Sequence, residues 1–169
     1  MSVSFDATVG SADATSYSTI AEADQYAIDY ALSIWTALAD EDVKKQYLNK
    51  AAQYIDSHYG DRLTGYKETT TQSLEYPRDY IYDDQSNILY DGVIPPQIKS
   101  AQIEAANFFA AGTDITADQG KAVTSESLQG LGKIEYRDYG LSQDVRTRID
   151  QLIRYPLIQK SGLTRWVRA

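Results

Sequence analysis

The strongest constraint on the fold of this chain is the helical spacing of its apolar residues. In the first such stretch, apolar side chains recur at intervals of three and four residues, which places them on one face of a helix. Thr19 and Glu22 form the sequence pattern of a capping box at its start. We expect Trp35 to close the end of this helix against the core. The stripe consists of Ile20, Ala23, Ala27, Tyr30 and Ile34.

Three later segments show the same spacing. Asp40 is a suitable N-cap for a helix that stops at Gly60. Pro95 and Pro96 suit the first turn of a helix that ends at Gly112, and Ser142 can cap a last helix. Because helices of this length are marginal alone, the sequence predicts a mainly α fold, a small antiparallel helical bundle. The three apolar faces are Leu48, Ala51, Ala52, Ile55 and Tyr59; Ile98, Ala101, Ala105 and Phe108; and Val145, Ile149 and Leu152.

Residues 61–91 form a long, irregular connection between the second and third helices. A loop of this length within a compact domain is usually functional or folded on itself. Leu74 and Tyr76 are expected to pin it to the helices, and Pro77 restricts the backbone around it. Arg78 is interpreted as a structural residue that pairs with a helix carboxylate or caps a helix end.

The remaining segments complete the predicted organisation. Residues 121–127 and 132–136 read as short extended pieces around a glycine-containing turn, which predicts a β-hairpin-like arm within residues 113–142. Residues 1–15 are small and polar and are expected to be flexible. We therefore predict a flexible N-terminus (1–15), one helical domain (16–156) and an extended C-terminal docking tail (157–169).

Several functional classes are disfavoured by composition. The chain has no cysteine and one histidine, His58, so thiolate and multi-histidine metal sites are excluded. The acidic pairs, such as Asp83 with Asp84, fall in a polar loop or a first helical turn, where carboxylates are ordinarily solvated. No apolar run approaches the ~20 residues of a membrane span. We expect a protein without cofactor, metal, membrane contact or enzymatic activity.

Charge is distributed unevenly along the chain. The formal net charge is −8; residues 1–136 hold nine basic and 21 acidic residues, a sum of −12, whereas residues 137–169 hold seven basic and three acidic, a sum of +4. This asymmetry predicts a partner surface in the C-terminal part, although a solvated basic helix face would give the same pattern. The candidate partner-binding residues are Arg154, Tyr155, Lys160, Arg165, Trp166 and Arg168.

Several short motifs occur in a fixed order between residues 16 and 112. They consist of Ser16, Tyr17, Ala23 to Tyr26, Trp35, Ala51, Ala52, Tyr54 to Asp56, Tyr59, Gly60, Gly65, Gln72, Leu74, Tyr76, Pro77, Arg78, Ile94, Pro95, Ala101, Glu104 and Ala105. Together these motifs resemble the phage head–tail connector proteins, a family of small helical head-completion adaptors. The sequence departs from the family pattern at Tyr76, where a tryptophan commonly precedes the Pro-Arg step.

The resemblance implies a structural virion protein. Its expected form is a ring of twelve subunits beneath the portal protein, at the head–tail junction, assembled in the host cytoplasm. Such a ring extends the channel for genomic DNA without binding it specifically, and carries the tail or stopper protein. The C-terminal residues would then dock on the portal.

A second function stays open, because an overlapping group of related proteins carries a DnaT-like, single-stranded-DNA-binding description. The basic residues of the C-terminal part, interleaved with Tyr155 and Trp166, could contact phosphates and stack bases. The acidic charge of the chain as a whole disfavours this alternative.

Overall fold

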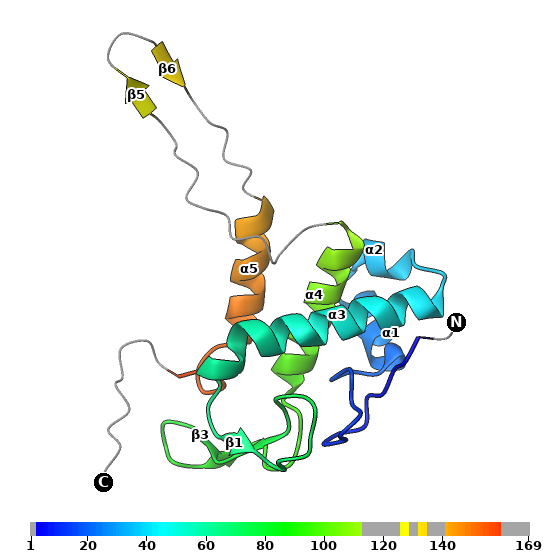
Figure 1. Ribbon diagram of the computed structural model, residues 1–169, viewed down its shortest axis with the longest axis vertical. Coiled ribbons are helices and arrows are strands. Elements are labelled where there is room, and N and C mark those ends of the chain that lie inside the picture. The colour runs from blue at the N-terminus through cyan, green and yellow to red at the C-terminus, as the bar shows by residue number, and fades with distance from the viewer. Residues whose placement is uncertain (1–2, 113–125, 129–131, 135–140, 160–169) are drawn as a thin grey trace.

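The computed structural model describes residues 3–112, 126–128, 132–134 and 141–159, and this part is mainly helical, as the sequence predicts (Figure 1). Helix α4 packs against α1, α2, α3 and α5, so it lies at the centre of the fold. Figure 1 shows α3 crossing α4, with α5 beside α4. The helices are α1 (Ile20–Asp29), α2 (Ser33–Thr36), α3 (Glu41–Tyr59), α4 (Pro96–Ala110) and α5 (Leu141–Leu152), with the 3-10 turn η1 (Gly60–Arg62).

Helix α1 begins with the predicted capping box. The Thr19 hydroxyl accepts a hydrogen bond from the backbone N–H of Glu22 at 3.2 Å, and the Glu22 carboxylate accepts one from the Thr19 N–H at 2.8 Å. The helix ends earlier than the apolar stripe predicts, because Ala31 adopts a φ of 54° and turns the chain. Tyr30 and Ile34 are therefore exposed rather than in the core.

Trp35 lies in the separate short helix α2 and is fully buried. Its backbone N–H donates to the side chain of Asn107 at 3.1 Å, and its indole N–H donates to Asp24 at 2.8 Å. The prediction that Trp35 packs into the core is correct, but Trp35 belongs to α2 and not to the end of α1.

Helix α3 matches the prediction closely. The Asp40 side chain accepts a hydrogen bond from the Asp42 N–H at 2.9 Å, as expected for an N-cap. Every residue of the predicted apolar face is buried. Gly60 follows the last residue of the helix, yet it keeps a right-handed φ of −47° and leads into η1.

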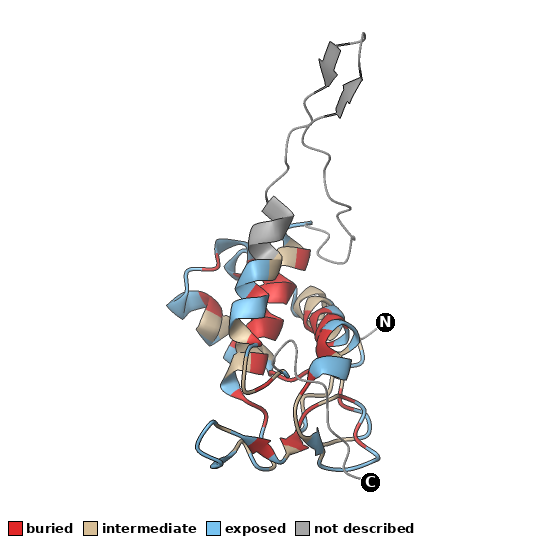
Figure 2. Cartoon of the chain, turned by 90° about the vertical axis from the view of Figure 1, so that its left-hand side faces the viewer, coloured by how far each residue is buried: buried red, intermediate tan, exposed pale blue. Residues whose placement is uncertain are grey.

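Helix α4 begins at Pro96, with Pro95 at the N-cap position. It buries residues on several sides, because it has neighbours on several sides, and the buried set includes the polar Gln102 and Glu104. Phe109 is 5 % exposed, whereas the predicted core residue Phe108 is only half-buried. Figure 2 shows buried residues concentrated where the helices face one another.

Residues 61–93 fold into a compact unit, which we call the 61–93 lobe. Strand β1 (Tyr66–Lys67) pairs antiparallel with β2 (Arg78–Asp79), and β3 (Ile81–Tyr82) pairs antiparallel with β4 (Ile88–Leu89). The long connection is therefore folded on itself, one of the two possibilities that its length suggested.

A third antiparallel pair lies in the predicted arm. Strand β5 (Glu126–Leu128) pairs with β6 (Gly132–Ile134), with Ser127 opposite Lys133. The rest of the arm, at residues 113–125, 129–131 and 135–140, lies outside the described residues. Helix α5 then starts at Leu141, so Ser142 lies within the helix and not at its cap.

The N-terminal segment has no regular element, but it is tied to the helices. The Thr15 N–H donates to the carbonyl of Asp6 at 2.7 Å, and the Asn49 side chain donates to the carbonyl of Ser4 at 2.9 Å. Ala14 is buried in the core. These contacts attach residues 3–15 to the helical body.

The chain after α5 also packs onto the body. Leu157 is 2 % exposed, and its carbonyl accepts a hydrogen bond from the Thr64 N–H at 2.9 Å. The Gln159 N–H donates to the carbonyl of Arg62 at 2.9 Å. Residues 157–159 therefore belong to the folded body, and a docking tail as predicted begins no earlier than residue 160.

Candidate interaction surfaces

Five of the residues that carry the family resemblance were expected to have a structural role, and all five are buried. Trp35, Tyr76, Pro77, Arg78 and Pro95 lie in the interior or at its edge. They build the helical body and the 61–93 lobe, and they do not form a surface for a partner.

Arg78 shows how the lobe is held together. Its guanidinium forms an ion pair with Glu75 at 2.6 Å and donates to the backbone carbonyls of Thr64 and Gly65 at 2.8 and 2.9 Å. These contacts are structural, but the carboxylate partner lies within the lobe and not on a helix. The arginine therefore links the first residues of the lobe to residues in its middle.

Two of the predicted partner-binding residues lie in the described part of the chain. Arg154 is exposed, and Tyr155 is half-buried with its hydroxyl donating to Asp84 at 2.7 Å. Both line a cavity of about 320 Å³ that also contacts Tyr90 and Gln97. The other four, Lys160, Arg165, Trp166 and Arg168, lie outside the described residues.

Exposed tyrosines mark the surface of the 61–93 lobe. Tyr66 and Tyr80 are each 59 % exposed, and their rings meet edge to face with centroids 6.4 Å apart. Tyr82 and Ile88, which face each other across the β3–β4 pair, are also exposed. Tyrosine combines an apolar ring with a polar tip and is enriched at protein interfaces. The sequence offered only a general signal for this surface, the 14 tyrosines among 169 residues.

A second exposed apolar region lies where α1 ends. Ile28 and Tyr30 are 67 % and 58 % exposed, and the Tyr30 ring stacks on that of Tyr26 with centroids 4.3 Å apart. Ile34 of α2 is exposed as well. The early end of α1 creates this region, so the helical stripe in the sequence could not have indicated it.

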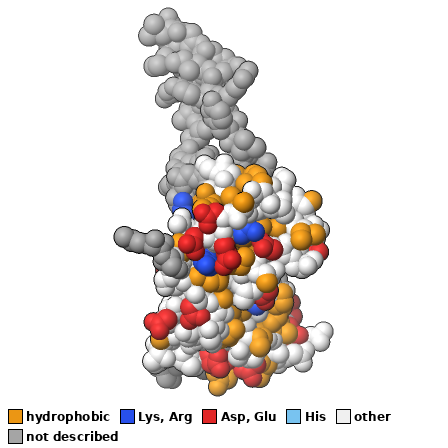
Figure 3. Space-filling view, turned by 90° about the vertical axis from the view of Figure 1, so that its right-hand side faces the viewer, with side chains coloured by type: hydrophobic (Ala, Val, Ile, Leu, Met, Phe, Trp, Pro, Cys, Tyr) orange, Lys and Arg blue, Asp and Glu red, His pale blue; other side chains and the backbone are white. Residues whose placement is uncertain are grey.

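The basic side chains of the body are largely matched with acidic ones. Residues 3–112 contain seven basic and 17 acidic side chains, a formal sum of −10. Figure 3 shows acidic and basic side chains next to each other on one face, without a broad basic area. The ion pairs of the described residues are Lys44–Asp24, Lys45 with Glu41 and Asp42, Lys67–Glu75, Arg78–Glu75, Lys99–Glu22 and Arg148–Glu104.

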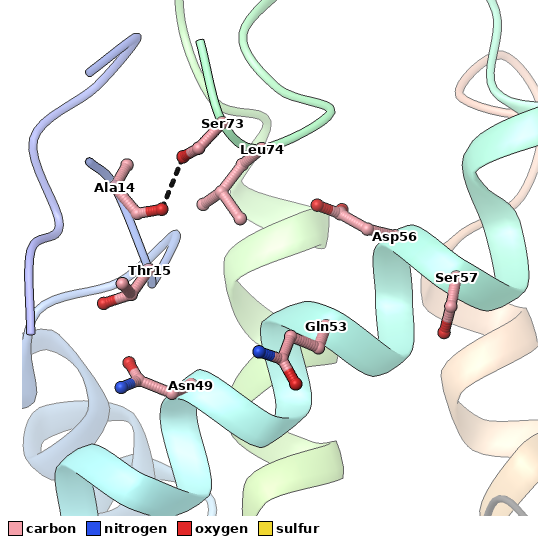
Figure 4. Close-up of a pocket in the computed structure, with 8 residues that line it drawn as sticks. All are labelled: Ala14, Thr15, Asn49, Gln53, Asp56, Ser57, Ser73 and Leu74. Carbon is pink, nitrogen blue, oxygen red and sulfur yellow. Dashed lines mark hydrogen bonds between the residues drawn. The ribbon is translucent and has the colours of Figure 1, made fainter. Parts of the chain in front are cut away.

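A cavity of about 520 Å³ lies between α3, the N-terminal segment and the lobe (Figure 4). Its lining includes Asn49, Gln53 and Ser73, with Asp56 at one side. Burial raises the pKa of Asp56 to about 6, although hydrogen bonds from the Tyr17 hydroxyl and the Glu75 N–H oppose that rise. Because those two bonds occupy the Asp56 carboxylate, it serves to join α3 to the lobe.

The lone histidine, His58, lies near the end of α3. The His58 ring stacks on Tyr54 with centroids 5.4 Å apart, and partial burial lowers the pKa of His58. The described residues contain no group of three or more His, Cys, Asp or Glu side chains that could hold a metal ion. Among their helices, none is both long and apolar enough to cross a membrane.

The fold and its surfaces define a mainly helical protein that presents exposed aromatic residues on an acidic body. A family model described as "Putative DnaT-like ssDNA binding protein" matches residues 1–169, and the chain belongs to this family. No curated protein and no solved structure matches the chain. The family match supports the part of the sequence resemblance that concerns the DnaT-like group.

Proposed function

We propose that this protein is a structural assembly protein, a head–tail connector subunit that forms a ring beneath the portal of a phage head. The observation that carries this proposal is a contrast between basic side chains, which are mostly in ion pairs, and tyrosine side chains, several of which are exposed. Most cations of the body are paired with its own carboxylates, whereas the side chains of Tyr66, Tyr80 and Tyr82 are exposed on the surface of the 61–93 lobe.

Affinity for nucleic acid depends on cations that can replace counterions along the phosphate backbone. A cation already paired within the protein contributes little to that exchange. The acidic body is therefore suited to surround DNA without holding it, which is what a channel requires. The resemblance of residues 16–112 to the connector adaptors supports the same function.

The proposed role is mechanical and involves no catalysis or cofactor. A rigid helical body with a lobe at one end can act as one wedge of a ring, proposed to contain twelve subunits. The portal protein on one side and a tail or stopper protein on the other complete the proposed set of partners, and the virion is the proposed location.

The experiment that tests this function is native mass spectrometry of the full chain, alone and with its cognate portal. The expected result is a stoichiometric ring on the portal. Substitution of Tyr66→Ser together with Tyr80→Ser should weaken that assembly, whereas Val9→Ser, at an apolar position 48 % exposed outside the lobe, should not. A chain that ignores the portal would contradict the proposal.

A second candidate function is single-stranded-DNA binding, and the family description is the observation that favours it. It would depend on the basic C-terminal residues. Its affinity for an oligonucleotide should fall steeply with salt. Arg165→Gln with Arg168→Gln should reduce that affinity, while Lys99→Gln, which removes a cation already paired with Glu22, should have little effect.

A further inference from the structure

The two faces of the β1–β2 pair differ in how their charges are matched. On one face, Lys67 and Arg78 lie opposite each other, and both form ion pairs with Glu75, at 3.1 and 2.6 Å. On the other face, Tyr66 lies opposite Asp79. Residues directly opposite each other in an antiparallel pair have Cβ atoms about 5 Å apart, so the side chains of Tyr66 and Asp79 project side by side.

The Asp79 carboxylate has no cation beside it in the described part of the chain. Within residues 3–112, 126–128, 132–134 and 141–159, no ion pair and no side-chain hydrogen bond involves Asp79. The two basic side chains of the strand pair are instead held by Glu75. Asp79 is half-buried, so a cation that contacted it would be partly shielded from water and would be attracted more strongly than at a fully exposed carboxylate.

Tyr80 completes this group of side chains, and its backbone conformation is unusual. Its ring meets that of Tyr66 edge to face, with centroids 6.4 Å apart, and its side chain is 59 % exposed. The residue has a φ of 60°, in the left-handed region that is unfavourable for an aromatic residue. A largely exposed ring offsets little of that strain by packing. Because backbone strain of this kind is characteristically retained where the side chain has a function, Tyr80 points to a binding role.

We propose that Tyr66, Asp79 and Tyr80 form a site for an arginine side chain of a partner protein. The guanidinium group is planar and weakly hydrated, so it can stack on an aromatic ring and pair with a carboxylate at the same time. Two exposed rings and one carboxylate without a counter-charge in the described chain supply both interactions. A lysine carries a strongly hydrated point charge, which gains less from the rings.

The charge of the 61–93 lobe favours a basic partner and disfavours an anionic one. Residues 61–93 contain seven acidic and three basic side chains, a formal sum of −4. Two of the basic side chains are already in ion pairs with Glu75, and Arg62 lies over the ring of Tyr59 at 5.0 Å. A phosphate-rich ligand would therefore meet mostly carboxylates here, whereas an arginine-bearing protein surface would be attracted. Which protein carries the arginine, the portal or the tail protein, rests on the proposed function; the chemistry of the site does not.

Two short peptides that differ in one side chain test the site on the full chain. An acetylated and amidated Ser-Arg-Ser peptide and its Ser-Lys-Ser counterpart are titrated into the protein while NMR follows the tyrosine ring protons. Tyr80→Gly is the main variant, because glycine adopts a positive φ without strain and the variant should stay folded. Asp79→Asn keeps the shape of the side chain and removes its charge. The matched controls are Tyr30→Ser, at an exposed tyrosine outside the lobe, and Asp61→Asn, at an exposed carboxylate within it.

We expect the arginine peptide to bind more tightly than the lysine peptide by about fivefold or more. Tyr80→Gly and Asp79→Asn should each weaken its binding by a similar factor, with the melting temperature showing that each variant stays folded. The two control substitutions should leave its affinity within about twofold of wild type.

Equal affinities for the two peptides would overturn the inference, and so would equal weakening by Asp61→Asn and Asp79→Asn, because either result would indicate only a general attraction to an acidic surface. A homo-oligomer of the chain alone that Tyr80→Gly disperses would also overturn it, because the site would then belong to a second copy. Peptide binding is measured without the portal. A failure of the arginine site is therefore distinguishable from a failure of the proposed connector function, which the assembly on the portal tests.

Discussion

Replacement of Gln102 by methionine should be among the most damaging single changes to the body of this protein. Gln102 lies in the middle of α4 with no exposed surface. Its side-chain oxygen accepts hydrogen bonds from the backbone N–H and the hydroxyl of Ser18, both at 2.9 Å. Its amide donates to the Ser16 hydroxyl at 2.8 Å and to the Leu48 carbonyl at 2.9 Å. One amide thus joins α4 to α3 and to the chain entering α1.

The expected loss of stability depends on which hydrogen-bond partners of Gln102 can form another hydrogen bond after the substitution. The Ser18 N–H would stay buried without an acceptor, at about 1–3 kcal/mol. The two hydroxyls can rotate, so they lose part of a bond each. Methionine has a similar shape and returns some apolar burial. The net destabilisation is about 3 kcal/mol, which for a chain of this size lowers the melting temperature by about 6–12 °C.

Urea unfolding followed by circular dichroism measures this difference directly. The matched control is Gln25→Met, because Gln25 is exposed on α1 and donates only to Asp29, at 2.8 Å. That substitution should change stability by no more than about 0.5 kcal/mol. If Gln102→Met also cost less than about 1 kcal/mol, the assignment of Gln102 as the link between the helices would be wrong.

Three further substitutions test other parts of the structure. Gly65 and Gly112 both have a positive φ, but only at Gly65 would an added Cβ lie 2.2 Å from a backbone oxygen. Gly65→Ala should therefore destabilise the fold by more than the ~1–2 kcal/mol expected for Gly112→Ala. Equal losses of stability in urea unfolding would refute the steric argument. Arg148→Met removes the 2.6 Å partner of the buried Glu104 and should cost about 3 kcal/mol, most of it restored by adding Glu104→Gln; additive effects in a double-mutant cycle would contradict this. The pKa of Asp56 is about 6 in the folded state and lower in the unfolded state, so the folded state binds this proton more tightly. As the pH rises from 4 to 6, the free energy of unfolding of the wild type should therefore fall by up to about 3 kcal/mol relative to that of Asp56→Asn. Parallel pH profiles for the two proteins would argue against a buried Asp56 carboxyl.

The local features of the helices were determined by the sequence alone. The capping box of Thr19 and Glu22, the N-cap Asp40 and the proline start of α4 each depend on residues within one turn of each other. The buried face of α3 also follows from spacing within one helix. Such features need no knowledge of the rest of the chain, so sequence patterns predict them well.

Features that depend on distant neighbours were decided by the tertiary structure. Gln102 and Glu104 interrupt the apolar pattern of α4, and their burial is possible only because Ser18, Leu48 and Arg148 supply partners from three other segments. No pattern within α4 could indicate those partners. The sequence consequently described α4 as a helix with one buried face, whereas the fold surrounds it.

The candidate surfaces show the same division. The sequence located the basic C-terminal residues and an excess of tyrosine, but it could not separate buried Tyr76 from exposed Tyr66 and Tyr80, because one residue type serves both roles. Packing against the helices made that choice. Packing also placed Leu157 in the core. The cavity beside Tyr155 is lined by residues of both α5 and the lobe, so it forms only when these two parts pack together.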